Sequence, residues 1–277
     1  MSKMITLYPL KQFRFPVTAE CISPDIFQDK KCEEVEALKI WEGNKKKRLG
    51  ELFKVEETKT DQHQAETTLA ISGDLSEVRR IGAYMTGGSI TIKGDVGTHL
   101  GEEMKGGKIT VHGNVASWAG SMMKGGTIEI RGNTSDYLAA PYRGSNQGMR
   151  GGEIIVHGDV GNETGAYMKK GLIKIYGNVG QFAGSRMHNG TIYVQKNCEG
   201  RVGACMRNGK IIIGGFLESV LPTFTIDSIR KRVKIGGDDA VEGYFYRFLG
   251  DLAENGIGKL FVFKDKNPQL HHYEEFL

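Results

Sequence analysis

A methionine recurs at a constant spacing through the middle of the chain, and this period restricts the possible folds more than any other feature. The spacing is nineteen positions throughout, except for a longer step of twenty-six between Met123 and Met149. The repeated methionines are Met85, Met104, Met123, Met149, Met168, Met187 and Met206. A short fixed period is typical of stacked repeat architectures, in which each unit contacts only its neighbours.

Each repeat unit begins with a short alternating segment, as at Ile90 and Ile92 on either side of Thr91. A unit of this length is too short for a pair of helices, and 31 of the 39 glycines fall between residues 69 and 215. Glycine weakens helices but suits tight corners with positive φ. We therefore expect an all-β core, built as a right-handed parallel β-helix of about seven coils at about 4.8 Å per coil, with α+β capping flanks.

Equivalent positions of successive units should form columns along such a fold. One column is apolar and is interpreted as an inward ladder: Val96, Val115, Thr134, Val160, Val179 and Cys198. The repeated methionines form a second column, which we expect to fill the core with flexible side chains.

A third column is rich in aromatic residues and is the best candidate for a protein-contact surface: His99, Trp118, Tyr137, Glu163, Phe182 and Arg201. The alternative is that these rings only stack on one another.

The long unit carries seven extra residues within 139–147. Insertions of this kind form loops on one face, which is either a working face or a neutral surface. The predicted subunit interface is Trp118, Tyr137, Tyr142, Arg143 and Phe182.

Three parts are expected along the chain: an N-terminal flank at 1–68, the repeat region at 69–215 and a C-terminal cap at 216–277. In the cap, apolar residues at helical spacing predict an amphipathic helix at about 239–254. These residues are Ala240, Val241, Tyr244, Phe245, Phe248, Leu249 and Leu252. A strand should follow at about 258–264.

Composition and motifs exclude several function classes. A formal net charge of +4 is too weak to indicate nucleic acid as a partner. The four cysteines include no CxxC pair, and no nucleophile elbow, phosphate-binding loop or HExxH motif occurs. No apolar stretch is long enough for a membrane span, and we expect no signal peptide. We therefore predict no catalytic, cofactor-binding or metal-ligating residue, and a cytoplasmic location.

A thirteen-residue motif, glycine with methionine three residues later and a second glycine nine residues after the methionine, marks the units. Its first and last residues are Gly82 with Gly94, Gly101 with Gly113, Gly120 with Gly132, Asn146 with Gly158, Gly165 with Gly177, Gly184 with Lys196, and Gly203 with Gly215. Seven copies with a longer gap before the fourth resemble the C subunit of formylmethanofuran dehydrogenase. The flanks agree, with Ile22-Ser-Pro-Asp25 and Phe27 near the start and a Gly-Lys-Leu-Phe-Val-Phe run near the end.

This resemblance implies a scaffold subunit in a complex that reduces CO2 and fixes it as N-formylmethanofuran, reversibly, in the first step of methanogenesis from CO2. The implied partners are the A, B and D subunits, with the polyferredoxin-type F and G subunits. The implied cofactors lie in these partners: a tungsten or molybdenum pterin, iron–sulfur clusters and a dinuclear zinc centre. The chain would dock the molybdopterin subunit and the amidohydrolase-like subunit.

Two alternatives share the repeat. One is the C subunit of a bacterial formyltransferase/hydrolase complex, which lacks the pterin and ferredoxin components. The other is the C-terminal GXGXG domain of glutamate synthase, acting within an amidotransferase complex. An autonomous carbohydrate-active enzyme would need clustered carboxylates on one face, and the column of Glu163 holds no second carboxylate.

Overall fold

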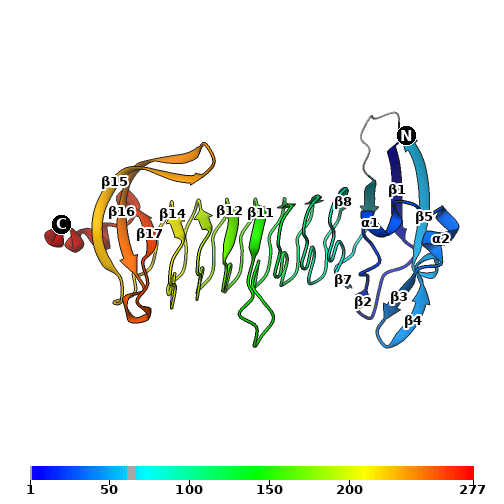
Figure 1. Ribbon diagram of the computed structural model, residues 1–277, viewed down its shortest axis with the longest axis horizontal. Helices are drawn as coiled ribbons and strands as arrows, with labels where there is room; N and C mark the ends of the chain where they lie inside the picture. Colours follow the sequence, from blue (N-terminus) through cyan, green and yellow to red (C-terminus); the bar gives the residue numbers. More distant parts are fainter. Residues whose placement is uncertain (1, 61–66) are drawn as a thin grey trace.

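Two β-sheets organise the protein, in a computed structural model that describes residues 2–60 and 67–277. The main sheet has 13 strands in the order β15-β16-β17-β14-β13-β12-β11-β10-β9-β8-β6-β1-β5. The second sheet has four strands in the order β4-β3-β2-β7. Figure 1 shows the main sheet along the longest axis of the molecule, with the two chain termini near opposite ends.

The first part of the chain holds short helices, the strands of the smaller sheet and three strands of the main sheet. These elements are β1 (Ser2–Pro9), β2 (Val17–Thr18), α1 (Pro24–Phe27), α2 (Cys32–Glu36), β3 (Lys39–Glu42), β4 (Lys45–Arg48), β5 (Phe53–Thr60), β6 (Thr68–Ser72) and β7 (Val78–Arg79). The repeat region contributes β8 (Ser89–Lys93), β9 (Lys108–Val111), β10 (Thr127–Ile130), β11 (Arg150–Val156), β12 (Lys170–Ile175), β13 (Thr191–Val194) and β14 (Lys210–Ile213). The last part holds β15 (Thr225–Gly236), β16 (Asp239–Gly250), β17 (Gly258–Phe263) and short 3-10 segments.

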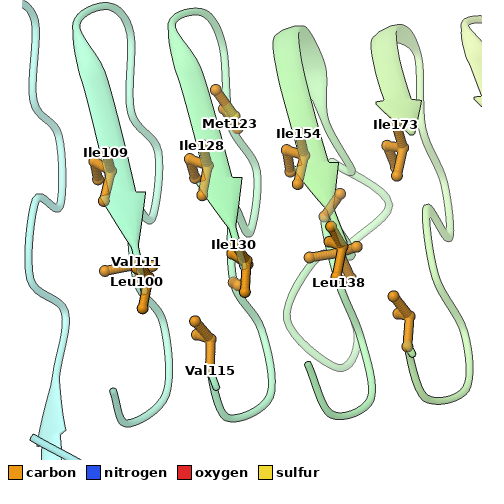
Figure 2. Packing of buried hydrophobic residues seen from close by; sticks show 14 of the residues in the cluster. Leu100, Ile109, Val111, Val115, Met123, Ile128, Ile130, Leu138, Ile154 and Ile173 are labelled. Atoms are coloured by element: carbon orange, nitrogen blue, oxygen red, sulfur yellow. The ribbon is translucent and has the colours of Figure 1, made fainter. Parts of the chain in front are cut away.

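Equivalent residues of successive units pair in parallel. Ile90 pairs with Ile109, and Ile109 with Ile128, one repeat apart each time. Ile128 pairs with Ile154 across the longer unit, so the insertion leaves the register unchanged. One face of every short strand is apolar and buried, as the alternating pattern predicts. Figure 2 shows Ile109, Ile128, Ile154 and Ile173 in a row on neighbouring strands.

The two core columns read from the sequence are confirmed. All seven repeated methionines have no exposed surface. The apolar column is joined by single parallel bridges from Val96 to Val115 and onward to Cys198, and each member is at most 6% exposed. The polar member Thr134, whose hydroxyl has no hydrogen-bond partner among the described residues, occupies one position of this column.

The predicted fold class is wrong. Most strands of the described residues lie in one large, mostly parallel sheet of 13 strands rather than in a right-handed parallel β-helix of about seven coils with α+β caps. Strands of both flanks continue the main sheet, because β5 pairs antiparallel with β1 at one end, and β16 pairs antiparallel with both β15 and β17 at the other. The flanking strands lack the repeat, so the repeat cannot reveal that they continue the same sheet.

The predicted helix at 239–254 is also wrong, because Asp239–Gly250 form strand β16 and only Leu252–Glu254 form a short 3-10 segment. Phe245 and Phe248 of this strand are buried in two different apolar clusters. A strand that is apolar on both faces can imitate helical spacing, and the aromatic content of this segment favours a strand. The predicted strand at 258–264 is confirmed as β17.

The hairpin of β15 and β16 explains apolar residues on the outward face of the main sheet. Its Val233, Ile235 and Phe245 pack against Tyr193 of β13 and Ile212 of β14. Figure 1 shows the hairpin reaching back over the sheet toward β12, where Lys174 Nζ donates to Asp239 Oδ2 at 2.5 Å.

The division into 1–68, 69–215 and 216–277 stays a prediction, and residues 1 and 61–66 of its first part lie outside the described residues. No helix within the described part is both long and apolar enough to span a bilayer.

Gly87 and Gly106 occupy the same position in successive units but differ in their surroundings. A Cβ atom on Gly106 would lie 2.2 Å from the Thr86 carbonyl oxygen, whereas one on Gly87 would meet nothing within 4 Å. Gly106→Ala should therefore lower the free energy of unfolding by about 1–3 kcal/mol through overpacking. Gly87→Ala should change it by no more than about 0.5 kcal/mol. Urea unfolding measures both, and equal effects at the two positions would contradict the close packing of units.

Candidate subunit interface

Four aromatic rings from three units and the insertion form one continuous stack, here called the aromatic corner: His99, Trp118, Tyr137 and Tyr142. Trp118 and Tyr137 are nearly parallel, with centroids 4.6 Å apart and an interplanar angle of 10°. His99 lies on the other side of Trp118 at 5.4 Å, and Tyr142 packs on His99 at 5.3 Å. All four residues are half-buried, so each keeps part of its surface in solvent.

The structure brings together four of the five predicted interface residues. Arg143 lies beside the aromatic corner, with its guanidinium carbon 5.9 Å from the Tyr137 ring centroid, and donates from Nη2 to Tyr137 Oη at 3.4 Å. Phe182 does not join this group, and the Arg201 guanidinium lies 5.1 Å from its ring centroid. The stacking that the sequence left as an alternative is thus present. The interface role itself stays a prediction.

Backbone conformation explains why these side chains project at a corner. His99, Trp118 and Tyr137 have φ of 63°, 64° and 66°, a left-handed conformation that costs L residues roughly 1–2 kcal/mol. The conformation is stabilised by hydrogen bonds to the next unit, such as Tyr137 N to Asn162 O at 2.8 Å. Arg80 has a φ of 66° and stands one repeat before His99, so the column begins one unit earlier than its aromatic pattern indicated.

Glu102, which is 1% exposed, is the centre of a polar network beneath the aromatic corner. Its carboxylate accepts hydrogen bonds from Arg80 Nε at 2.8 Å and Arg80 Nη2 at 3.1 Å, and from Tyr142 Oη. Arg80 Nη2 also donates to Tyr142 Oη at 2.8 Å, and Arg80 forms an ion pair with Glu20. The network therefore joins the N-terminal flank, two units and the insertion.

Sequence reasoning missed Glu20, Arg80 and Glu102. One signal was available for Glu102, because equivalent positions of the other units hold small or neutral polar residues: Ala83, Ser121, Gln147, Ala166, Ser185 and Ala204. A carboxylate in such a column needs charged partners to be buried. Glu20 and Arg80 are far apart in the chain, with no local pattern that joins them.

Burial changes the ionisation of two groups in this region. It lowers the pKa of His99 to about 4, and the positive charges of Arg80 and Arg79 act in the same direction. Burial also raises the pKa of the Glu102 carboxyl, although the hydrogen bond and the charge of Arg80 partly offset this effect. His99 Nδ1 and Trp118 Nε1 are buried with no hydrogen-bond partner among the described residues.

Other surfaces of the described residues are weaker candidates for a functional site. A groove of about 660 Å³ follows Asp159, Asn178 and Asn197, but these side chains accept hydrogen bonds from the backbone of the next unit. In residues 2–60 and 67–277, no three His, Cys, Asp or Glu side chains are grouped so that they could hold a metal ion.

The sequence is similar to characterised proteins, over most of the chain in one case and over about a third of it in another. No family model matches it. The C subunit of the tungsten-containing formylmethanofuran dehydrogenase 2 of Methanococcus maripaludis is 45% identical over 261 residues, 92% of this chain and 94% of that protein. The C subunit of the molybdenum-containing formylmethanofuran dehydrogenase 1 of Methanothermobacter thermautotrophicus is 42% identical over 95 residues, 34% of this chain. The match spans 23% of the length of that relative.

A solved structure is similar over nearly its whole length. It is a chain of the formyltransferase/hydrolase complex from Methylorubrum extorquens, in complex with methylofuran. The TM-score is 0.81 at 30% identity, and the match covers 93% of this chain and 99% of that chain.

Tyr142→Phe should loosen the insertion while the ring remains on His99. The change removes the hydroxyl that bonds to Glu102 and Arg80, and hydrogen bonds to charged groups contribute about 1.5–3 kcal/mol. Amide hydrogen exchange across 141–148 should therefore become faster. The control Tyr137→Phe loses only the 3.4 Å contact with exposed Arg143 and should leave exchange unchanged. Unaltered exchange in Tyr142→Phe would show that the network does not hold the insertion.

His99→Phe should remove part of the acid sensitivity of the protein. Below the ordinary histidine pKa of about 6.5, the unfolded chain takes up a proton that folded His99 does not bind until about pH 4. The neutral ring therefore costs stability progressively as the pH falls through this window, and phenylalanine avoids this loss. Melting temperatures at pH 7, 5.5 and 4 should show the variant gaining relative to wild type. His112→Phe, at an exposed position, is the matched control, and a pH-independent difference for His99→Phe contradicts the interpretation.

Proposed function

The chain belongs to the family of formylmethanofuran dehydrogenase C subunits, and we propose that it acts as a non-catalytic scaffold that docks the catalytic subunits of that complex. The observation that carries this proposal is the 45% identity over 92% of the chain. The proposed complex reduces CO2 to formate and condenses formate with methanofuran, giving N-formylmethanofuran. Both steps are assigned to partner subunits.

The proposed partners are the B subunit with the molybdopterin, the amidohydrolase-like A subunit, the D subunit, and the polyferredoxin-type F and G subunits. We assign the tungsten or molybdenum pterin, the iron–sulfur clusters and the dinuclear zinc centre to these partners. This chain would supply the surface that sets their relative position.

The aromatic corner and Arg143 are the proposed contact surface. Tryptophan, tyrosine and arginine are the residue types that most often dominate binding energy at protein interfaces. The stack is rigid because its residues are fixed by backbone hydrogen bonds and the Glu102 network, so little conformational entropy is lost on binding. Half-buried rings still offer apolar surface to a partner.

A second candidate function is the C subunit of a formyltransferase/hydrolase complex that lacks the pterin and ferredoxin components. The TM-score of 0.81 over 93% of the chain favours it. The sequence identity to that chain is 30%, against 45% to the C subunit of the tungsten-containing enzyme. Metal analysis of the purified assembly separates the two, because tungsten or molybdenum excludes the second candidate.

A paired alanine experiment tests the docking proposal. The tagged full chain is purified from native cells, and co-purifying subunits are identified by mass spectrometry. Tyr137→Ala with Arg143→Ala should reduce partner recovery about tenfold, since a loss of about 1.4 kcal/mol has this effect. The control is Tyr244→Ala with Lys231→Ala, which removes an exposed ring with a cation at 5.6 Å from the hairpin of β15 and β16.

Two outcomes contradict the proposal. One is equal partner recovery with both double variants, which removes the assignment of the surface. The other is CO2 reduction or formyl transfer by the isolated wild-type chain, which removes the scaffold role.

A further inference from the structure

The residue after each repeated methionine is basic in every unit but the first, where it is Thr86. These residues form what is here called the basic row: Lys105, Lys124, Arg150, Lys169, His188 and Arg207. The fold does not require a positive charge at this position, because Thr86 fills it in the first unit. The recurrence therefore needs another explanation.

Backbone hydrogen bonds place the members of the basic row one above another. The amides of Lys124, Lys169 and Arg207 donate to the methionine carbonyls one unit earlier at 2.7, 2.8 and 2.8 Å. Neighbouring members are therefore one strand spacing apart, about 4.8 Å, and the whole row is about 24 Å long. Like charges at such a spacing repel each other, so the row opposes folding slightly rather than assisting it.

Few of these charges are neutralised within the described residues. Lys124 forms an ion pair with Glu103, and Lys169 Nζ donates to Gln147 Oε1 at 3.2 Å. The side chains of Lys105, Arg150 and Arg207 are exposed and have no side-chain hydrogen bond or ion pair in the described part of the chain. Three cations along one edge are thus available to an outside partner.

The basic row ends in a pocket of about 360 Å³. Arg186, His188 and Arg207 line it, together with Tyr167, Asn146 and Glu254. The Arg186 guanidinium lies 5.5 Å from the Tyr167 ring centroid, which restricts its position. Arginine side chains in a concave site suit a carboxylate, which can accept hydrogen bonds from both branches of a guanidinium.

We propose that the basic row docks an extended acidic peptide segment of a partner protein, with one carboxylate of that segment in the pocket. The proposal rests on the scaffold function and identifies a second contact surface, separate from the aromatic corner. An extended peptide of about seven residues, at about 3.3 Å per residue, matches the length of the row. The low net charge of +4 and the covered face of Tyr167 favour a peptide over a nucleic acid, which prefers open aromatic platforms.

Fluorescence anisotropy with a labelled acidic peptide of alternating glutamate and serine tests the proposal on the full chain. Wild type should bind the peptide, and the affinity should fall with added salt. The triple variant Lys105→Glu, Arg150→Glu, Arg207→Glu should bind at least about tenfold more weakly. The matched control reverses three exposed charges on β4, Lys45→Glu, Lys46→Glu and Arg48→Glu, and should bind like wild type.

A neutral triple variant, with glutamine at Lys105, Arg150 and Arg207, should give an intermediate affinity. It keeps the proposal testable if the charge-reversed protein does not fold. Equal losses in the row and β4 variants would overturn the proposal, because they indicate a net-charge effect. So would no binding by wild type, or a single-stranded DNA oligonucleotide of equal charge that binds as tightly as the peptide.

The two proposals fail differently. If wild type binds the acidic peptide but recovers no partner subunit from cells, the scaffold function is wrong and the peptide site stands. If wild type recovers its partners and the row variant binds the peptide undiminished, only the peptide site is wrong.

Discussion

The backbone of each unit lies against the backbone of the next, and this contact controls most of what the sequence can vary. A Cβ atom on Gly94 would lie 2.0 Å from the Gly73 carbonyl oxygen, so no side chain fits there. Hydrogen bonds run through the same contacts, as from the Lys105 amide to the Met85 carbonyl at 2.7 Å. Because the step is constant, each position in the unit becomes a column whose members are neighbours. The neighbours of a side chain are therefore set by its column, so the chemical properties of this protein follow from whole columns rather than from single residues.

The polar network shows what happens when one column member departs from its neighbours. Glu102 stands in a column of small or neutral residues, and an isolated buried carboxylate would be strongly destabilising. Arg80 and Tyr142 satisfy it, and Tyr142 comes from the insertion in a later unit. The position of the insertion is thus coupled to the charge of Glu102 in an earlier unit. The aromatic corner is coupled to the same charge, because Tyr142 also packs on the His99 ring.

The spacing of residues along the sequence predicted part of this fold correctly. The buried methionines, the apolar column and strand β17 follow from spacing alone. Strand β16 could not be recognised in this way, because both of its faces are apolar and its partners β15 and β17 lack the repeat. Tyr193 and Ile212 face outward and become buried only through a hairpin that follows later in the chain. For the candidate interface, the rings could be named, whereas Arg80 and Glu20 required the tertiary contacts.

The antiparallel strands at both ends of the main sheet give the parallel stack a defined length. The edge strand β15 carries Arg230, Lys231, Arg232 and Lys234, all exposed, and such charges prevent another strand from adding to an edge. Between the ends, the distance grows only in whole strand spacings of about 4.8 Å. The number of repeats therefore sets the length of the parallel region. Anything attached at the two ends is held at a separation that evolution can change only in steps of whole repeats.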